Sequence, residues 1–161
     1  MTSLTLINSS YTSFPKVYDN QGGSAAVLRV KDLMSQSLEV VSPDAHLHYV
    51  LVKMNQTGYR HLPVVAGDTL VGIITDRDLR LAVNSPIVEE QADLNRGTVL
   101  GVPVSDCMTP DPQCVSSNTP LHEVAELLCL NKFGAMPVVD DGKLVGMISY
   151  IDFLKHYAAN R

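Results

Sequence analysis

An internal duplication limits the folds open to this chain more than any other feature of its sequence. Residues recur at one constant offset of 74 positions: Asp32 as Asp106, Pro63 as Pro137, Gly72 as Gly146, and Asp78 as Asp152. Because the offset is constant, no insertion or deletion separates the two copies within the repeat. Self-similarity at a fixed period is typical of repeat architectures. We therefore predict two tandem copies of one structural unit, over residues 30–84 and 104–158.

Each copy is predicted to fold in the order strand, helix, strand, strand, helix. The first helix of each copy carries an apolar stripe at i, i+3, i+4 and i+7: Leu47, Val50, Leu51 and Met54, then Leu121, Val124, Ala125 and Leu128. We expect Gly58 to end the first of these helices, and Thr119 with Pro120 to begin the second. Segments 61–75 and 135–149 each hold two β-branched runs around a Gly-Asp or Asp-Gly pair, which predicts a hairpin.

A single copy has too little apolar surface for a core of its own, so we expect the two copies to cover each other's sheets. The predicted fold is therefore α/β, of the α+β kind. Residues 1–29 fall outside the repeat and are rich in Ser, Thr and Asn, which favours a flexible arm. Residues 85–103 connect the copies, and their polar composition favours a solvated loop.

Composition narrows the classes of function. The chain has 161 residues, a net charge of -5 and 45% apolar residues, which is typical of a globular protein and unfavourable for nucleic-acid binding. Cys107, Cys114 and Cys129 have no metal-ligand spacing, so we expect reduced thiols. We find no apolar run long enough to span a membrane and no signal-peptide pattern, so we expect a cytoplasmic protein without membrane insertion. No nucleophile–base set or metal motif suggests an enzyme.

A hydroxyl-x-x-aspartate motif occurs once in each copy, in "GIITDRDL" and "GMISYIDF". The pairs Thr75–Asp78 and Ser149–Asp152 have the spacing of a helix capping box. The same groups also suit a ligand, since a carboxylate accepts hydrogen bonds from a ribose diol and a helix N-terminus favours phosphate. Gly72 would allow either a ligand or a neighbouring backbone to approach closely. Spacing alone leaves both alternatives open.

The duplicated motifs, from "DLMS" to "LPVVAGDTLVGIITDRDL" and from "DCMT" to "MPVVDDGKLVGMISYIDF", resemble the cystathionine-β-synthase (CBS) domain family. A tandem pair of such domains is called a Bateman module. The resemblance implies two sheets packed with pseudo-twofold symmetry, and two clefts between the repeats. It also implies regulatory binding of AMP, ADP, ATP, S-adenosylmethionine or NAD, frequent homodimers, and no catalytic activity of the module itself.

The resemblance assigns roles to individual residues. Asp78 and Asp152 correspond to the family's ribose-binding aspartate, with Thr75 and Ser149 as ribose or phosphate contacts. The "RHLP" segment is directed at the ligand, although its cations could equally be solvated surface groups. The predicted nucleotide-binding residues are Arg60, His61, Leu62, Thr75, Arg77, Asp78, Ala135, Met136, Ser149 and Asp152.

The cations of the first copy predict two unequal sites. Arg60, His61 and Arg77 have the uncharged counterparts Gly134, Ala135 and Ile151 in the second copy. We expect one site to suit a phosphorylated nucleotide and the other a less charged ligand.

The predicted function is a sensor of adenosine ligands. Binding would shift the arrangement of the repeats or of a homodimer, and a protein partner would respond. The alternative is a nucleotide-independent module for dimerisation and protein interaction, in which Asp78 and Asp152 serve only as helix caps.

Overall fold

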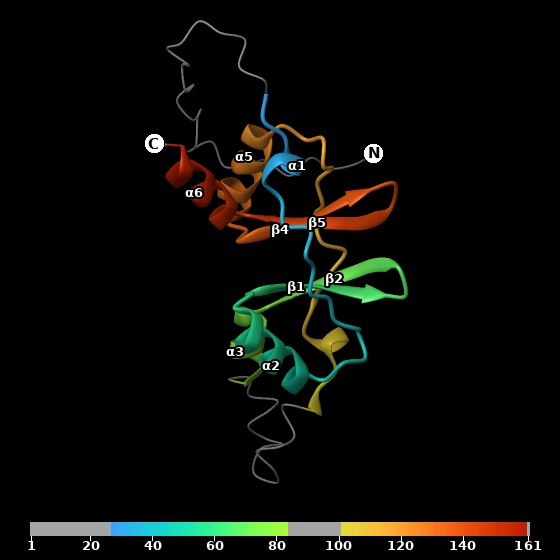
Figure 1. The fold of residues 1–161 in the computed structure, drawn as a ribbon. Helices are drawn as coiled ribbons and strands as arrows, with labels where there is room; N and C mark the ends of the chain where they lie inside the picture. The colour runs from blue at the N-terminus through green and yellow to red at the C-terminus, as the bar shows by residue number, and fades with distance from the viewer. Residues whose placement is uncertain (1–26, 84–100, 161) are drawn as a thin grey trace, which may run out of the picture.

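The computed structural model describes residues 27–83 and 101–160 (Figure 1). The first part contains α1 (Val30–Leu33), α2 (Leu47–Thr57), β1 (His61–Ala66), β2 (Thr69–Thr75) and α3 (Asp76–Val83). The second contains η2 (Val104–Asp106), β3 (Thr109–Pro110), α5 (Leu121–Asn131), β4 (Ala135–Asp140), β5 (Lys143–Ser149) and α6 (Tyr150–Ala159). The arm predicted over residues 1–29 and the connector predicted over 85–103 lie almost wholly outside the described residues.

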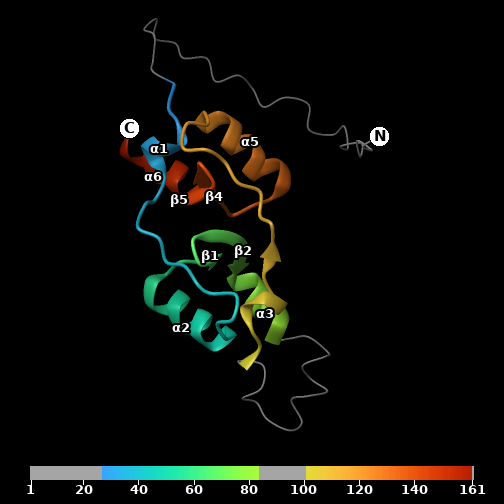
Figure 2. The ribbon, with the colours of Figure 1, turned by 90° about the vertical axis from the view of Figure 1, so that its right-hand side faces the viewer.

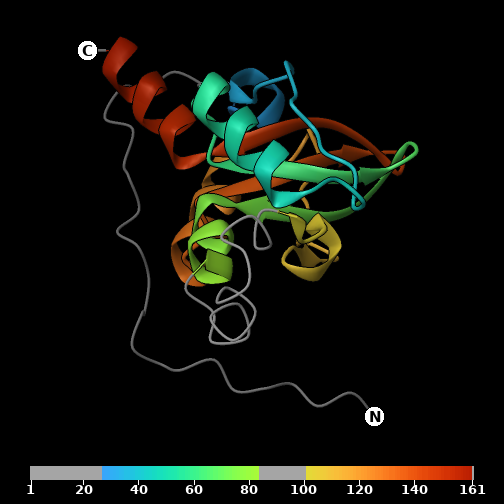
Figure 3. The ribbon, with the colours of Figure 1, turned by 90° about the horizontal axis from the view of Figure 1, so that it is seen from below.

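The molecule is built from two stacked halves (Figure 1). β1 and β2 carry α2 and α3 on their outer side, and β4 and β5 carry α5 and α6 on theirs. The two sheets face each other at the centre, where β2 contacts β5. The hairpin tips point to one side and the helices lie toward the other (Figure 3). This arrangement confirms the predicted α+β fold in which the two copies pack through their sheets.

Both predicted hairpins form, in the same register. β1 pairs antiparallel with β2, and β4 with β5, and each ladder shifts at the same valine pair, Val64–Val65 or Val138–Val139. At the second tip Asp141 and Gly142 have φ of 50° and 76°, the positive values that a two-residue hairpin turn requires. The pairing sets Ala135 opposite Ser149 at the open end of its hairpin, where the candidate site lies.

The strand predicted ahead of the first helix is present in both copies only as a short extended segment that pairs at a single residue. Each is reduced to one parallel bridge, Val41 to Val64 and Val115 to Val138. In a parallel ladder the next backbone donor after Val41 would come from Pro43, which has no N–H. In the second copy that N–H belongs to Ser117, and it donates instead to the carboxylate of Asp140 at 3.0 Å.

The helix ends follow the prediction in one copy and depart from it in the other. Gly58 caps α2 with φ of 74° and donates its N–H to the carbonyl of Met54, as expected for a left-handed C-terminal glycine. α5 begins one residue later than predicted, with Pro120 in an extended conformation as its N-cap. The hydroxyl of Thr119 accepts instead from the N–H of Ser116 at 3.2 Å, so Thr119 closes a turn before the helix. Within the predicted stripe, Leu51 is exposed.

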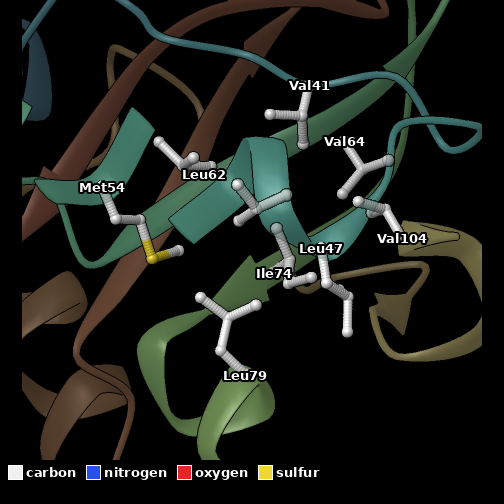
Figure 4. Close-up of a cluster of buried hydrophobic side chains, with 9 residues drawn as sticks. Val41, Leu47, Met54, Leu62, Val64, Ile74, Leu79 and Val104 are labelled. Carbon is white, nitrogen blue, oxygen red and sulfur yellow. The ribbon is translucent and has the colours of Figure 1, made fainter. Parts of the chain in front are cut away.

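The copies exchange their first segments, which the sequence analysis did not predict. Val30 is fully buried in the core beneath β4 and β5. Val104 is fully buried in the core beneath β1 and β2 (Figure 4). Ser35 donates its N–H to Met147 at 2.9 Å. The chain therefore crosses between the halves at residues 34–41 and again at 107–117 (Figure 2). Each half is assembled from both copies.

The glycines of the two motifs make room for these crossings. A Cβ on Gly146 would lie 2.7 Å from Sδ of Met34 and 3.2 Å from the carbonyl oxygen of Ser35. A Cβ on Gly72 would lie 3.1 Å from the carbonyl oxygen of Thr109. Of the two alternatives for Gly72, the structure supports the close approach of a neighbouring chain segment.

Candidate ligand-binding site

A cavity of about 570 Å³ lies between the two copies, which is within the usual range for sites of small molecules. The first copy lines it with Ser35, residues 37–39, residues 57–61 and Pro63. The second copy lines it with Gly134, Ala135, Met147, residues 149–152 and Lys155. The open end of the β4–β5 hairpin and the first turns of α6 therefore meet the segment that leads into β1.

The aspartate of the second motif is both a helix cap and a free acceptor. The backbone N–H and the hydroxyl of Ser149 donate to the same oxygen, Oδ2 of Asp152, at 2.8 and 2.6 Å. The other oxygen, Oδ1, accepts no hydrogen bond from any described residue. Because the cap uses one oxygen only, Asp152 can hold the start of α6 and still accept from a ligand. The two alternatives that spacing left open are therefore compatible.

The first motif has the same capping geometry, but it lies outside the cavity. Oδ2 of Asp78 accepts from the N–H and the hydroxyl of Thr75, at 2.8 and 2.7 Å, and the N–H of Asp78 returns to that hydroxyl at 3.2 Å. Neither residue is among those that line the cavity. A ligand on Asp78 stays a prediction.

The structure brings together half of the predicted nucleotide-binding residues. Those that line the cavity are Arg60, His61, Ala135, Ser149 and Asp152. Leu62 and Met136 are enclosed in the two cores, so their side chains are not available to an adenine base. Arg77 is exposed on α3 and does not line the cavity.

Two cations of the first copy lie at the motif of the second copy. Arg60 and His61 line the cavity that contains Asp152, whereas Arg77 does not, and the predicted inequality of two sites stays a prediction. The ring of His61 crosses to the second copy, where a Cβ on Gly134 would lie 2.5 Å from its Cε1 atom. The packing therefore brings the start of β1 against the start of β4, so the first copy supplies groups to the cavity that contains Asp152.

The surroundings of His61 favour its neutral form. Burial lowers the pKa of its imidazole below the ordinary value, and Arg60 lowers it further, while Asp76 and Asp78 oppose this shift. The ring makes no hydrogen bond to a described residue. A ring nitrogen at the cavity wall is therefore available to a ligand, and a bound anion would favour the protonated ring.

Sequence reasoning missed two lining residues that bear on the chemistry. Tyr59 precedes Arg60 and is exposed, and Lys155 lies three residues beyond Asp152 on α6. The i, i+3 spacing could have identified Lys155, because residues three apart share a helix face. Glu39 also lines the cavity, but Lys53 pairs with it at 2.5 Å.

Metal ligands, thiols and apolar helices are the remaining features of the described ranges that bear on function. Residues 27–83 and 101–160 contain no group of three His, Cys, Asp or Glu side chains that could hold a metal ion. Their three cysteines are free, and burial raises the pKa of the Cys107 and Cys114 thiols, which favours the protonated form. None of the helices in these ranges has both the length and the apolar character needed to cross a bilayer.

Comparison with known proteins identifies the repeat. The family model described as the CBS domain matches residues 30–85 and 104–159. A CBS domain-containing protein of Dictyostelium discoideum is 39% identical over 127 residues, which cover 78% of this chain and 88% of that protein.

Solved structures with the same fold are also found. The CBS-pair protein CBSX2 of Arabidopsis thaliana, in complex with AMP, is 32% identical with a TM-score of 0.68, over 81% of this chain and 96% of that one. A protein of Methanocaldococcus jannaschii is 29% identical with a TM-score of 0.77, over 81% of this chain. The match spans 48% of that protein, about half of its length.

Proposed function

The chain belongs to the CBS-domain family as a tandem pair, and on this premise we propose that it is a regulatory module that binds an adenosine-containing ligand between its repeats. One observation carries the proposal: a carboxylate oxygen of Asp152 without a partner among the described residues shares a cavity with Arg60 and His61 of the other repeat. The similar CBSX2 pair in complex with AMP supports this choice of ligand class.

The lining of the cavity is suited to the parts of such a ligand. Oδ1 of Asp152 accepts hydrogen bonds from the ribose diol, at a site that the cap with Ser149 holds rigid. Apolar lining from Leu38, Met147 and Ile151 provides a surface for the base. AMP, ADP, ATP and S-adenosylmethionine all contain this adenosine core.

Signalling would follow from the shared construction of the site. Because both repeats line the cavity, a ligand contacts both and favours the mutual arrangement in which those contacts are best. We propose that a homodimer or a regulated protein partner responds to this shift. The exposed Leu154 and Tyr157 on α6, the helix that carries Asp152, support such an interface.

The same exposed side chains favour a second candidate, an interaction module that needs no nucleotide. In that case Asp152 acts only as the cap of α6 and the cavity has no ligand. Ligand-dependent stability separates the two candidates.

Thermal unfolding with AMP, ADP, ATP or S-adenosylmethionine tests the proposal. A ligand at one hundred times its dissociation constant stabilises the folded state by about 2.7 kcal/mol, which raises Tm by about 5–10 °C for a chain of this size. Asp152→Asn keeps a capping oxygen but loses the charge, and it should abolish most of the shift. Asp32→Asn is the matched control, because Asp32 caps α1 in the same way but does not line the cavity, and it should leave the shift in place. A flat response of the unmodified protein to all four ligands would support the interaction module.

A further inference from the structure

The crossing segment 34–41 brings a second carboxylate to the cavity. Among the described residues that line the cavity, Asp152 and Glu39 carry the carboxylates. Asp152 is the ligand anchor of the proposed function, whereas Glu39 lies on the segment that passes from one half of the molecule to the other (Figure 2). An uncompensated negative charge at the wall of a small cavity opposes the binding of an anion. The charge of Glu39 therefore bears on which ligands the cavity accepts.

Lys53 compensates the charge of Glu39 from outside the cavity. It lies on α2, and its ammonium group donates to Oε2 of Glu39 at 2.5 Å. The side chain of Lys53 is only 17% exposed, so solvent and salt screen this pair less than a pair of fully exposed side chains. The hydrogen bond to Glu39 raises the pKa of Lys53, which keeps the ammonium charged at neutral pH. Lys53 does not line the cavity, so it acts on the cavity through Glu39.

Tyr49 helps to hold Lys53 in place. It lies four residues earlier on α2, and its ring centroid is 5.4 Å from Nζ of Lys53. This distance is within the range of a cation–π contact, and the i, i+4 spacing places both side chains on one face of the helix. The ammonium group is therefore held between an aromatic ring and the carboxylate of Glu39.

The sequence offset shows that the ion pair belongs to one crossing only. The positions 74 residues after Glu39, Tyr49 and Lys53 hold Gln113, Glu123 and Leu127. The second crossing, at residues 107–117, forms without a carboxylate or a lysine at these places. The packing of a crossing segment therefore does not require the pair, which favours a role at the cavity that Glu39 lines.

Resting on the proposed function, we propose that Lys53 is a specificity-determining residue that acts through Glu39: it neutralises this carboxylate, so that the cavity accepts anionic adenosine ligands. Without Lys53, the charge of Glu39 is uncompensated at the cavity wall. This charge repels an anionic ligand, leaves a neutral ligand nearly unaffected and attracts a cationic one. A mere loss of structure would instead weaken the binding of all three kinds of ligand.

Calorimetric titration of Lys53→Met with AMP, adenosine and S-adenosylmethionine tests the assignment. AMP is an anion, adenosine is neutral and S-adenosylmethionine is a net cation. We expect AMP to bind about tenfold or more weakly, because two charges about 10 Å apart at an effective dielectric constant of about 20 change an affinity by that factor. Adenosine binding should be nearly unchanged, and S-adenosylmethionine should bind at least as tightly as it binds the unmodified protein.

Two further variants separate charge from folding. The double variant Glu39→Gln/Lys53→Met lacks both charges and should recover most of the AMP affinity lost in Lys53→Met. Lys143→Met removes a lysine from the tip of the β4–β5 hairpin, which does not line the cavity. It is the control for net charge and should leave all three affinities unchanged.

The outcomes separate this inference from the proposed function. A loss that follows the charge of the ligand and is reversed in the double variant supports the role of Lys53. Equal losses for AMP and adenosine, an unchanged AMP affinity, or no recovery in the double variant overturns this role and leaves an adenosine-binding module in place. If the unmodified protein binds none of the three ligands, the proposed function fails, and the role of Lys53 with it.

Discussion

Replacing Val30 by alanine should destabilise the second half of the molecule, although Val30 belongs to the first copy in sequence. Its side chain is fully buried in the core formed with Leu121, Val124 and Met136. The substitution removes two methyl groups, worth about 1.6 kcal/mol at about 0.8 kcal/mol each. The cavity left behind adds about 1 kcal/mol. We therefore expect the free energy of unfolding to fall by about 2–3 kcal/mol.

Urea denaturation measures that loss, and native-state hydrogen exchange locates it. Amides of β4 and β5 should exchange faster in Val30→Ala, whereas Val104→Ala should affect those of β1 and β2. Val27→Ala is the matched control, because Val27 is 59% exposed, and it should change stability by no more than about 0.5 kcal/mol. Faster exchange in β1 and β2 upon Val30→Ala would refute the exchange of segments.

Two further predictions concern Gly146 and His61. Gly146→Ala should lower the free energy of unfolding by about 1–3 kcal/mol, because its Cβ would meet Met34 and the carbonyl of Ser35. Urea denaturation should show that adding Met34→Ala to this variant recovers part of the loss. Additive losses in the double variant would contradict the contact. His61 has a folded-state pKa below its unfolded value, so the unfolded chain binds more protons and stability falls as pH drops through about 6.5. Melting curves between pH 5 and 8 should show a shallower acid-side decline for His61→Gln, and identical profiles would exclude this linkage.

Local signals in the sequence predicted the elements better than their assembly. Asp141 and Gly142 specify a tight turn by their own conformational preferences, and Gly58 ends α2 for the same kind of reason. The shortness of the first extended segment was also readable in part, since Pro43 removes a ladder donor. The donation of the Ser117 N–H to Asp140 was not readable, because it depends on a side chain 23 positions away.

The composition of the site depends on symmetry that local patterns do not encode. The motif with Asp152 was recognisable from spacing and resemblance, but its partners Arg60 and His61 come from the other copy. Only the packing of the two sheets brings them together. The same packing places Val30 in the core beneath β4 and β5, and Val104 in the core beneath β1 and β2.

The central claim is that a nucleotide binds between the repeats on Asp152, and a crystal structure of the protein with saturating AMP tests it most directly. We expect the ribose diol within hydrogen-bonding distance of Oδ1 of Asp152. An empty cavity at saturation, or AMP seated only on Asp78, would contradict the account.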